Sequence, residues 1–164
     1  MLKQYLGGYC GRMHLYTKRA CSTIQDDNSY LTSPAMFKEY IEPVERSIMS
    51  GLPSSVYHMH NTSLHLGSII ADYGLDTIQI SVDPNGGPLE KQLVIYEIMK
   101  KKTPLVLSCW NLSDMEILRQ NLTPQGLALT FIPAPDGCQI NKNGKFDEFF
   151  LWQQAYENWI QLYL

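Results

Sequence analysis

The sequence lacks any apolar stretch near the ~20 residues that a membrane-spanning helix needs. No long apolar core follows the first residues, so no secretion signal is recognised. A basic stripe is also missing: the net charge is -3, and the lysine run 100–102 closes a predicted helix, where cations suit the helix dipole. These absences exclude a membrane partner and argue against a nucleic-acid partner. We therefore expect a cytoplasmic protein.

Cysteine pairs at CxxC spacing are absent as well. The four cysteines are Cys10, Cys21, Cys109 and Cys138, and in a cytoplasmic chain they are most simply free thiols. The glycine-rich stretch 7–11 is not followed by the GK(S/T) of a phosphate-binding loop. What remains is ordinary globular composition over 164 residues, enough for one domain with a real core.

Hydrophobic runs and turn signals alternate along most of the chain. Strands are predicted over residues 54–59, 75–82, 104–109 and 127–132. Helices are predicted over residues 33–50, 62–73, 88–102, 113–121 and 145–163. Strands that alternate with helices at this spacing indicate parallel βα units, and so an α/β fold.

Local signals set several boundaries of these elements. Ser33 and Pro34 form a helix start, and Pro43 predicts a kink or break inside the helix that they begin. Asp83 and Asn85 are expected to shape the turn after the second predicted strand through side-chain to backbone hydrogen bonds.

The whole chain, residues 1–164, is predicted to be one domain. Residues 1–32 are expected to be an irregular N-terminal segment, and residues 33–164 carry the βα repeats. Four strands do not close a (β/α)₈ barrel, which takes about 250 residues. The fold is therefore a small open sheet or part of a barrel. A half-barrel leaves two open sheet edges, so we expect pairing with a second copy or with a complementing chain.

Two histidines end the first predicted strand. Residues two apart on a strand point to the same side, so Val56, His58 and His60 share one face. The carboxyl ends of parallel strands are where α/β proteins bind ligands. His58 and His60 are therefore candidate site residues at the rim of the sheet.

Four stretches resemble segments of one known family. Residues 25–37 (QDDNSYLTSPAMF) are similar to a family segment with glutamine, aspartate and then Ser-Pro-x-x-Phe. Residues 57–61 (YHMHN) stand where relatives carry Tyr-His-Leu-Asp-Gly or, in methyltransferases, His-x-Cys-Gly. Residues 74–79 resemble the next strand of the family, and residues 122–127 a late helix-to-strand junction. Over residues 20–132 the chain thus resembles the C-terminal half of the uroporphyrinogen decarboxylase-like superfamily, which includes cobalamin-dependent methyltransferases.

The resemblance implies a (β/α)₈ barrel of which this chain supplies about half. The family's methyltransferases bind zinc through His-x-Cys and a later cysteine, and the zinc holds a thiol substrate as the thiolate that attacks a corrinoid-bound methyl group. For this chain the resemblance implies zinc on His58, His60 and Cys138, with a histidine in place of the first cysteine. Imidazole is a competent zinc ligand. The corrinoid would be carried by a partner protein.

Three further side chains are candidates at the same rim. Asp27 matches the family's aspartate before the Ser-Pro helix, and with His58 and His60 it completes the candidate catalytic set. Gln79 and Trp110 stand at or near the ends of two strands and are candidates for binding a small-molecule substrate.

Two functions stay open. One is methyl transfer involving a corrinoid, once a complete barrel is assembled. Uroporphyrinogen decarboxylation itself is not expected, because the arginines of that site belong to the N-terminal part of the family fold. The other is a non-catalytic chain that binds a partner through its sheet edges. In that alternative His58 and His60 are hydrogen-bonded structural residues, and Cys138 is an ordinary loop cysteine.

Overall fold

Each strand of the main sheet pairs with the strand that follows it in sequence. The computed structural model describes residues 9–10, 16–17, 21–27 and 29–131. Its main sheet has five strands in the order β3-β4-β5-β6-β7, and every pair is parallel. The strands are β3 (Ser22–Gln25), β4 (Ser55–His60), β5 (Thr77–Val82), β6 (Leu105–Cys109) and β7 (Leu127–Phe131). A separate antiparallel pair consists of β1 (Tyr9–Cys10) and β2 (Tyr16–Thr17).

Helical segments connect the strands of the sheet. Between β3 and β4 lie η2 (Ser29–Leu31), α2 (Pro34–Met36), the π-helical turn η3 (Phe37–Ile41) and α3 (Glu42–Ser50). Between β4 and β5 lie η4 (Asn61–Leu66), α4 (Gly67–Ile70) and η5 (Ala71–Tyr73). Single helices, α5 (Leu89–Lys100) and α6 (Leu112–Asn121), make the last two connections. Within the described ranges no helix has the length and apolar character needed to cross a bilayer.

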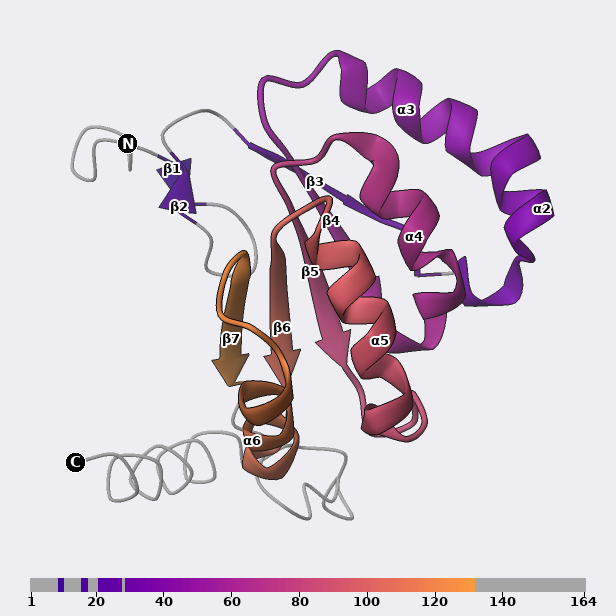
Figure 1. Ribbon diagram of the computed structural model, residues 1–164. Helices are drawn as coiled ribbons and strands as arrows, with labels where there is room; N and C mark the ends of the chain where they lie inside the picture. Colours follow the sequence, from indigo (N-terminus) through magenta and orange to yellow (C-terminus); the bar gives the residue numbers. More distant parts are fainter. Residues whose placement is uncertain (1–8, 11–15, 18–20, 28, 132–164) are drawn as a thin grey trace, which may run out of the picture.

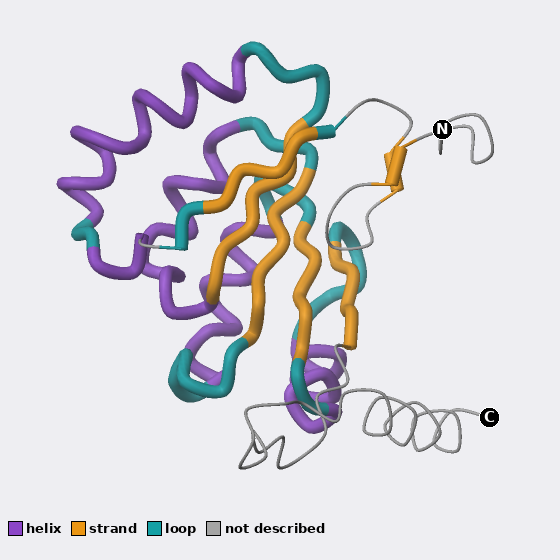
Figure 2. Tube along the Cα trace, turned by 180° about the vertical axis from the view of Figure 1, so that it is seen from behind, coloured by secondary structure: helices purple, strands orange, loops and turns teal. Residues whose placement is uncertain are grey.

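The sequential strand order decides where the helices lie. Connections between neighbouring parallel strands are almost always right-handed, so an unreversed order places all of them on one face of the sheet. Figure 1 shows α3, α4 and α5 on that face. Figure 2, from behind, shows the strands on the viewer's side, and no described helix covers them there. The fold is thus a run of parallel βα repeats with one helix-covered face, as in part of a barrel wall.

The two faces of the sheet differ in chemistry. Tyr57 and Met59 on β4, with Ile78 and Ile80 on β5, belong to the apolar core between strands and helices. Their neighbours in sequence point the other way, and they are largely polar. The polar side chains of that face include His58, His60, Gln79, Ser81, Ser108 and Thr130.

The predicted helix over 33–50 exists in a modified form. Ser33 is its N-cap and accepts a hydrogen bond from the backbone N–H of Met36, and Pro34 takes the first helical position. The kink or break predicted at Pro43 corresponds to a change of helix type without interruption, because the π-helical turn over Phe37–Ile41 runs directly into an α-helix that carries Pro43 in its first turn. The proline lacks an N–H, so the helical ladder cannot run through it unchanged.

Other details differ from the expectations. The stretch 1–32, expected to be irregular, contains β3, so the sheet has five strands rather than four. The connection over 62–73 is largely 3₁₀ rather than one α-helix. The cap of α6 is Asn111, whose side chain accepts from the N–H of Asp114, so this helix begins at Leu112, one residue before the predicted start. The predicted helix over 145–163 lies outside the described residues.

Candidate metal centre

The two histidines of β4 lie side by side on the helix-free face. Their ring centroids are 5.0 Å apart and the rings are nearly perpendicular, at 78°. Strand alternation predicted this shared face, and the prediction is confirmed. The pair sits at the carboxyl end of β4, where the chain leaves the sheet into η4.

A chain of hydrogen bonds runs from His58 on β4 through β5 and β6 to β7 and holds the imidazole in place. Its Nδ1 contacts Oε1 of Gln79, the residue in register on β5. The amide Nε2 of Gln79 donates to Oγ of Ser108 on β6 at 2.8 Å, and Ser108 contacts the Thr130 hydroxyl on β7 at 2.7 Å. A carbonyl oxygen only accepts, so Nδ1 of His58 carries the proton. A metal would therefore be bound by Nε2 of His58.

His60 is oriented in the same way by a carboxylate. Its Nδ1 lies 2.5 Å from Oδ2 of Asp83, in the loop after β5. The other oxygen of Asp83 accepts from the indole N–H of Trp110 at 3.1 Å. The backbone carbonyl of Asp83 accepts from the N–H of Gly86 and closes the turn, but the carboxylate contacts His60 and Trp110 instead of making the predicted side-chain to backbone hydrogen bond. The sequence did not predict its second role, as the partner of His60.

Asp27 approaches the pair from the segment after β3. One carboxylate oxygen lies 3.6 Å from Nε2 of His60, and the side chain is 57% exposed. Gln25 donates to both oxygens, at 2.8 and 2.7 Å, and holds the carboxylate in place. Asp27, His58 and His60 can each offer one ligand atom, and these atoms lie within 4.8 Å of one another.

The donor set fits a zinc ion. Zinc sites that keep an open position use three protein ligands, and two histidines with a carboxylate are one of the known combinations. Metal-binding histidines almost always donate their second N–H to a carboxylate or a carbonyl oxygen, which fixes the tautomer. Both features occur here, with Gln79 and Asp83 as the acceptors.

The remaining candidates have different positions. Trp110 holds Asp83, and Gln79 is only 1% exposed, so both support the histidines from behind rather than line an open surface. Cys138 lies outside the described residues. Cys109 ends β6 but packs in the apolar core, on the face of the sheet opposite His58 and His60, and burial raises the pKa of its thiol to about 12.

An open cavity of about 340 Å³ adjoins the centre. It is lined by Asp27, Tyr30, His60, Thr62, Asp83 and Asn85. The walls combine a phenol ring with hydroxyl and amide groups. A small molecule in this cavity would therefore meet the exposed side of Asp27 and His60.

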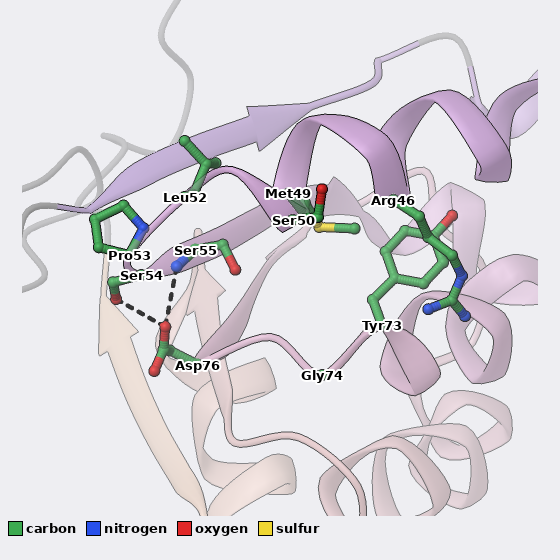
Figure 3. Close-up of a pocket in the computed structure, with 10 residues that line it drawn as sticks. All are labelled: Arg46, Met49, Ser50, Leu52, Pro53, Ser54, Ser55, Tyr73, Gly74 and Asp76. Atoms are coloured by element: carbon green, nitrogen blue, oxygen red, sulfur yellow. Dashed lines mark hydrogen bonds between the residues drawn. The ribbon is translucent and has the colours of Figure 1, made fainter.

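A second cavity, of about 400 Å³, lies at the opposite end of the strands (Figure 3). Asp76 accepts there from the Ser54 hydroxyl at 2.7 Å and from the Ser55 N–H at 3.0 Å. The Arg46 guanidinium lies over the Tyr73 ring, 4.5 Å from its centroid. The Asp76 contacts join the starts of β4 and β5, and the Arg46 contact joins α3 to η5. Open α/β sheets bind ligands at the carboxyl ends of their strands, which is the other end. The cavity is therefore not the candidate site.

Comparison of the chain with protein-family models, with curated proteins and with solved structures finds no match. The resemblance to the uroporphyrinogen decarboxylase-like superfamily thus stays a prediction that rests on the four motifs.

Proposed function

We propose that this chain is a zinc-dependent methyltransferase of the uroporphyrinogen decarboxylase-like type, with zinc on Asp27, His58 and His60. One observation carries the proposal: both imidazoles present Nδ1 to a fixed acceptor, and Asp27, His58 and His60 can each offer one ligand atom within 4.8 Å of the others. That arrangement is the usual outer shell of a metal-binding histidine.

The proposal is supported at His60, the position where this chain differs from the family motif. His60 replaces the cysteine of the methyltransferase pattern, and its anchoring by Asp83 gives it the geometry of a ligand. Asp27 supplies the third donor that the resemblance assigned to a late cysteine. The five parallel strands and their one-sided helices are compatible with half of a (β/α)₈ barrel.

The chemistry follows from the proposed ligands. A zinc ion held there supplies a positive charge that favours the thiolate form of a bound thiol. The resemblance implies that the thiolate sulfur attacks a corrinoid-bound methyl group. A methylated corrinoid would serve as the methyl donor, and the thiol substrate would be the methyl acceptor. Tyr30, Thr62 and Asn85 line the space for the rest of the substrate, and a partner protein brings the corrinoid.

A carboxylate ligand favours a second candidate function. Two histidines and a carboxylate also form the zinc site of hydrolases, in which the open position holds water. Asp27 is the residue that carries this alternative.

Thiol binding to the cobalt-loaded protein tests the proposal. Cobalt(II) adopts zinc sites and shows a sulfur-to-metal charge-transfer absorption when a thiolate binds. With 2-mercaptoethanol as the probe, we expect this absorption in the native chain and its loss in His60→Ala. A cobalt-loaded protein whose spectrum ignores the thiol would contradict thiol activation and favour the hydrolase alternative.

A further inference from the structure

The loop that carries Asp83 is held by two buried amide side chains. The loop, residues 83–87, follows β5 and leads to α5, and the Asp83 carbonyl closes its turn by accepting from the Gly86 N–H at 3.0 Å. Asn61, 3% exposed, reaches the loop from η4, and Gln92, 6% exposed, reaches it from α5. Side chains from two other elements therefore hold the backbone of the loop.

Gln92 makes two hydrogen bonds to the loop. Its Nε2 donates to the carbonyl of Gly86 at 2.9 Å and to the carbonyl of Gly87 at 3.0 Å. Its Oε1 accepts from the Tyr96 hydroxyl at 2.7 Å and from Nδ2 of Asn61 at 3.3 Å. The amide nitrogen meets only acceptors and the amide oxygen only donors, so these four contacts fix the orientation of the amide. Gln92 thus anchors the end of the loop that leads to α5.

Asn61 links Gln92 to the backbone of Asp83. The same Nδ2 that contacts Gln92 also donates to the Asp83 carbonyl at 3.0 Å. The other amide atom of Asn61, Oδ1, is buried and meets no donor among the described residues. A buried acceptor without a donor costs free energy, which an apolar side chain of similar size would avoid. We take this cost as a sign that the amide is needed where it meets the loop.

Asp83 connects this loop to the candidate metal centre. Its Oδ2 lies 2.5 Å from Nδ1 of His60, and its Oδ1 accepts from the Trp110 N–H at 3.1 Å. The position of the carboxylate beside the imidazole depends on where the loop holds the Asp83 backbone. Hydrogen bonds weaken steeply as their angles depart from the preferred geometry. A displacement of the loop would thus weaken the contact that sets the tautomer of His60.

We propose that Gln92 is a positioning residue of the metal centre and acts on His60 through the loop and Asp83. The inference rests on the proposed function, which makes His60 a ligand of zinc. Gln92 belongs neither to the three ligand residues nor to the lining of the adjoining cavity. Loss of a group that directly holds a metal ligand lowers metal affinity by ~10–100-fold. Gln92 lies further out, so we expect the lower end of that range, ~10-fold, when its amide is removed.

Gln92→Met and Thr103→Val form a matched pair of variants. Each keeps the approximate shape of a buried side chain and removes its hydrogen bonding to a backbone carbonyl. Thr103 donates to the Ala71 carbonyl at 2.9 Å, at the amino end of β6 and away from the loop. Urea unfolding measures the stability of both variants, and calorimetric titration measures their zinc affinity. We expect the ~10-fold loss of zinc affinity in Gln92→Met and native affinity in Thr103→Val.

Tyr96→Phe is a milder variant of the same path. It removes only the hydroxyl that donates to Oε1 of Gln92, so the ring and the Gln92 contacts with the loop remain. Its zinc affinity should lie between those of native protein and Gln92→Met. The comparison with Thr103→Val can be made with Tyr96→Phe if Gln92→Met does not fold.

The tautomer of His60 tests the same path in metal-free protein. Long-range proton–nitrogen NMR spectra at pH 8 distinguish the protonated ring nitrogen from the unprotonated one. In native protein and in Thr103→Val we expect the proton on Nδ1, and in Gln92→Met a mixture of the two tautomers. A purely structural role of Gln92 would lower stability without this change.

The outcomes separate this inference from the proposed function. Native protein that binds no zinc would reject the proposed function, and the His60 tautomer would then decide the role of Gln92 alone. Zinc binding by native protein, with equal affinity and an unchanged tautomer in Gln92→Met, would overturn the positioning role. An equal loss of affinity in Thr103→Val would also overturn it, because the effect would then follow stability.

Discussion

Nδ1 of His60 lies 2.5 Å from Oδ2 of Asp83, although the two residues belong to different βα units. Removal of the carboxylate leaves His60 without the acceptor that sets its tautomer and orientation. We expect Asp83→Ala to weaken zinc binding by ~10–100-fold, the usual effect of losing such a partner. Asp83→Asn keeps an acceptor oxygen, so its zinc affinity should fall less than that of Asp83→Ala. Calorimetric titration with zinc measures both, and unchanged affinity in Asp83→Ala would disprove this role for Asp83.

Gln79 is the corresponding partner of His58. Gln79→Leu keeps the volume but leaves the buried Nδ1–H of His58 without an acceptor, at a cost of ~1–3 kcal/mol in stability. We expect lower zinc affinity as well, because the ring can then adopt the other tautomer. Ser108→Ala removes the hydrogen bonds that Ser108 makes with Gln79 Nε2 and with Thr130 but keeps the contact between Gln79 and His58, so it serves as the matched control. Calorimetric titration measures the zinc affinity of both variants. A larger loss of zinc affinity in Ser108→Ala than in Gln79→Leu would show that Gln79 does not position His58.

Gly86 lies directly against the buried side chain of Asn61. A Cβ at this position would come within 2.1 Å of Nδ2 of Asn61, which donates to the Asp83 carbonyl. Gly86→Ala should therefore displace Asn61 and the loop that holds Asp83, at a cost of ~1–3 kcal/mol. Urea unfolding measures the loss. At Gly51 a Cβ would meet nothing closer than 3.7 Å, so Gly51→Ala should stay near native stability.

Glu45 is a buried carboxyl that accepts hydrogen bonds from the hydroxyls of Tyr57 and Tyr73. Burial raises the pKa of this carboxyl above the ordinary 4.5, because the effect of burial is larger than that of the two tyrosine hydrogen bonds, which lower the pKa. The folded state then holds the proton more tightly than the unfolded state. Its contribution to stability is complete below the ordinary pKa and declines as the pH rises through the folded value.

Glu45→Gln has no proton to lose at this position. The free energy of unfolding of the native chain should therefore fall relative to Glu45→Gln as the pH rises above 4.5. Urea titrations at a series of pH values measure the difference between the two proteins. A difference that grows in the opposite direction would show that the two tyrosine hydrogen bonds outweigh burial.

The rhythm of strands and helices from β4 to β7 was predictable because each strand is an apolar or alternating run between turn signals. The shared face of His58 and His60 followed from strand alternation alone. β3 was missed because Ser22–Gln25 is short and carries three polar side chains, so no hydrophobic run marks it. Without β3, the position of Asp27 beside His60 could not be derived.

The contact of Asp83 with His60 was not predicted, for a different reason. It begins the run Asp-Pro-Asn-Gly-Gly, and that local pattern is fully explained by a turn. Its contact with His60 depends on the pairing of β4 with β5 and on the end of β5 lying beside the end of β4. Such register is set by packing of the whole sheet, which a local pattern does not report.

The number of zinc ions bound per chain is the most direct measurement. His65 serves as the control, because it is an exposed histidine of η4 and contacts only the Thr32 carbonyl among the described hydrogen bonds. Calorimetric titration should show one zinc per chain in the native protein and in His65→Ala, and no specific binding in His60→Ala. X-ray absorption of the loaded protein should show zinc–nitrogen or zinc–oxygen distances of about 2.0–2.2 Å. Equal zinc binding by native protein and His60→Ala would contradict the metal centre on Asp27, His58 and His60.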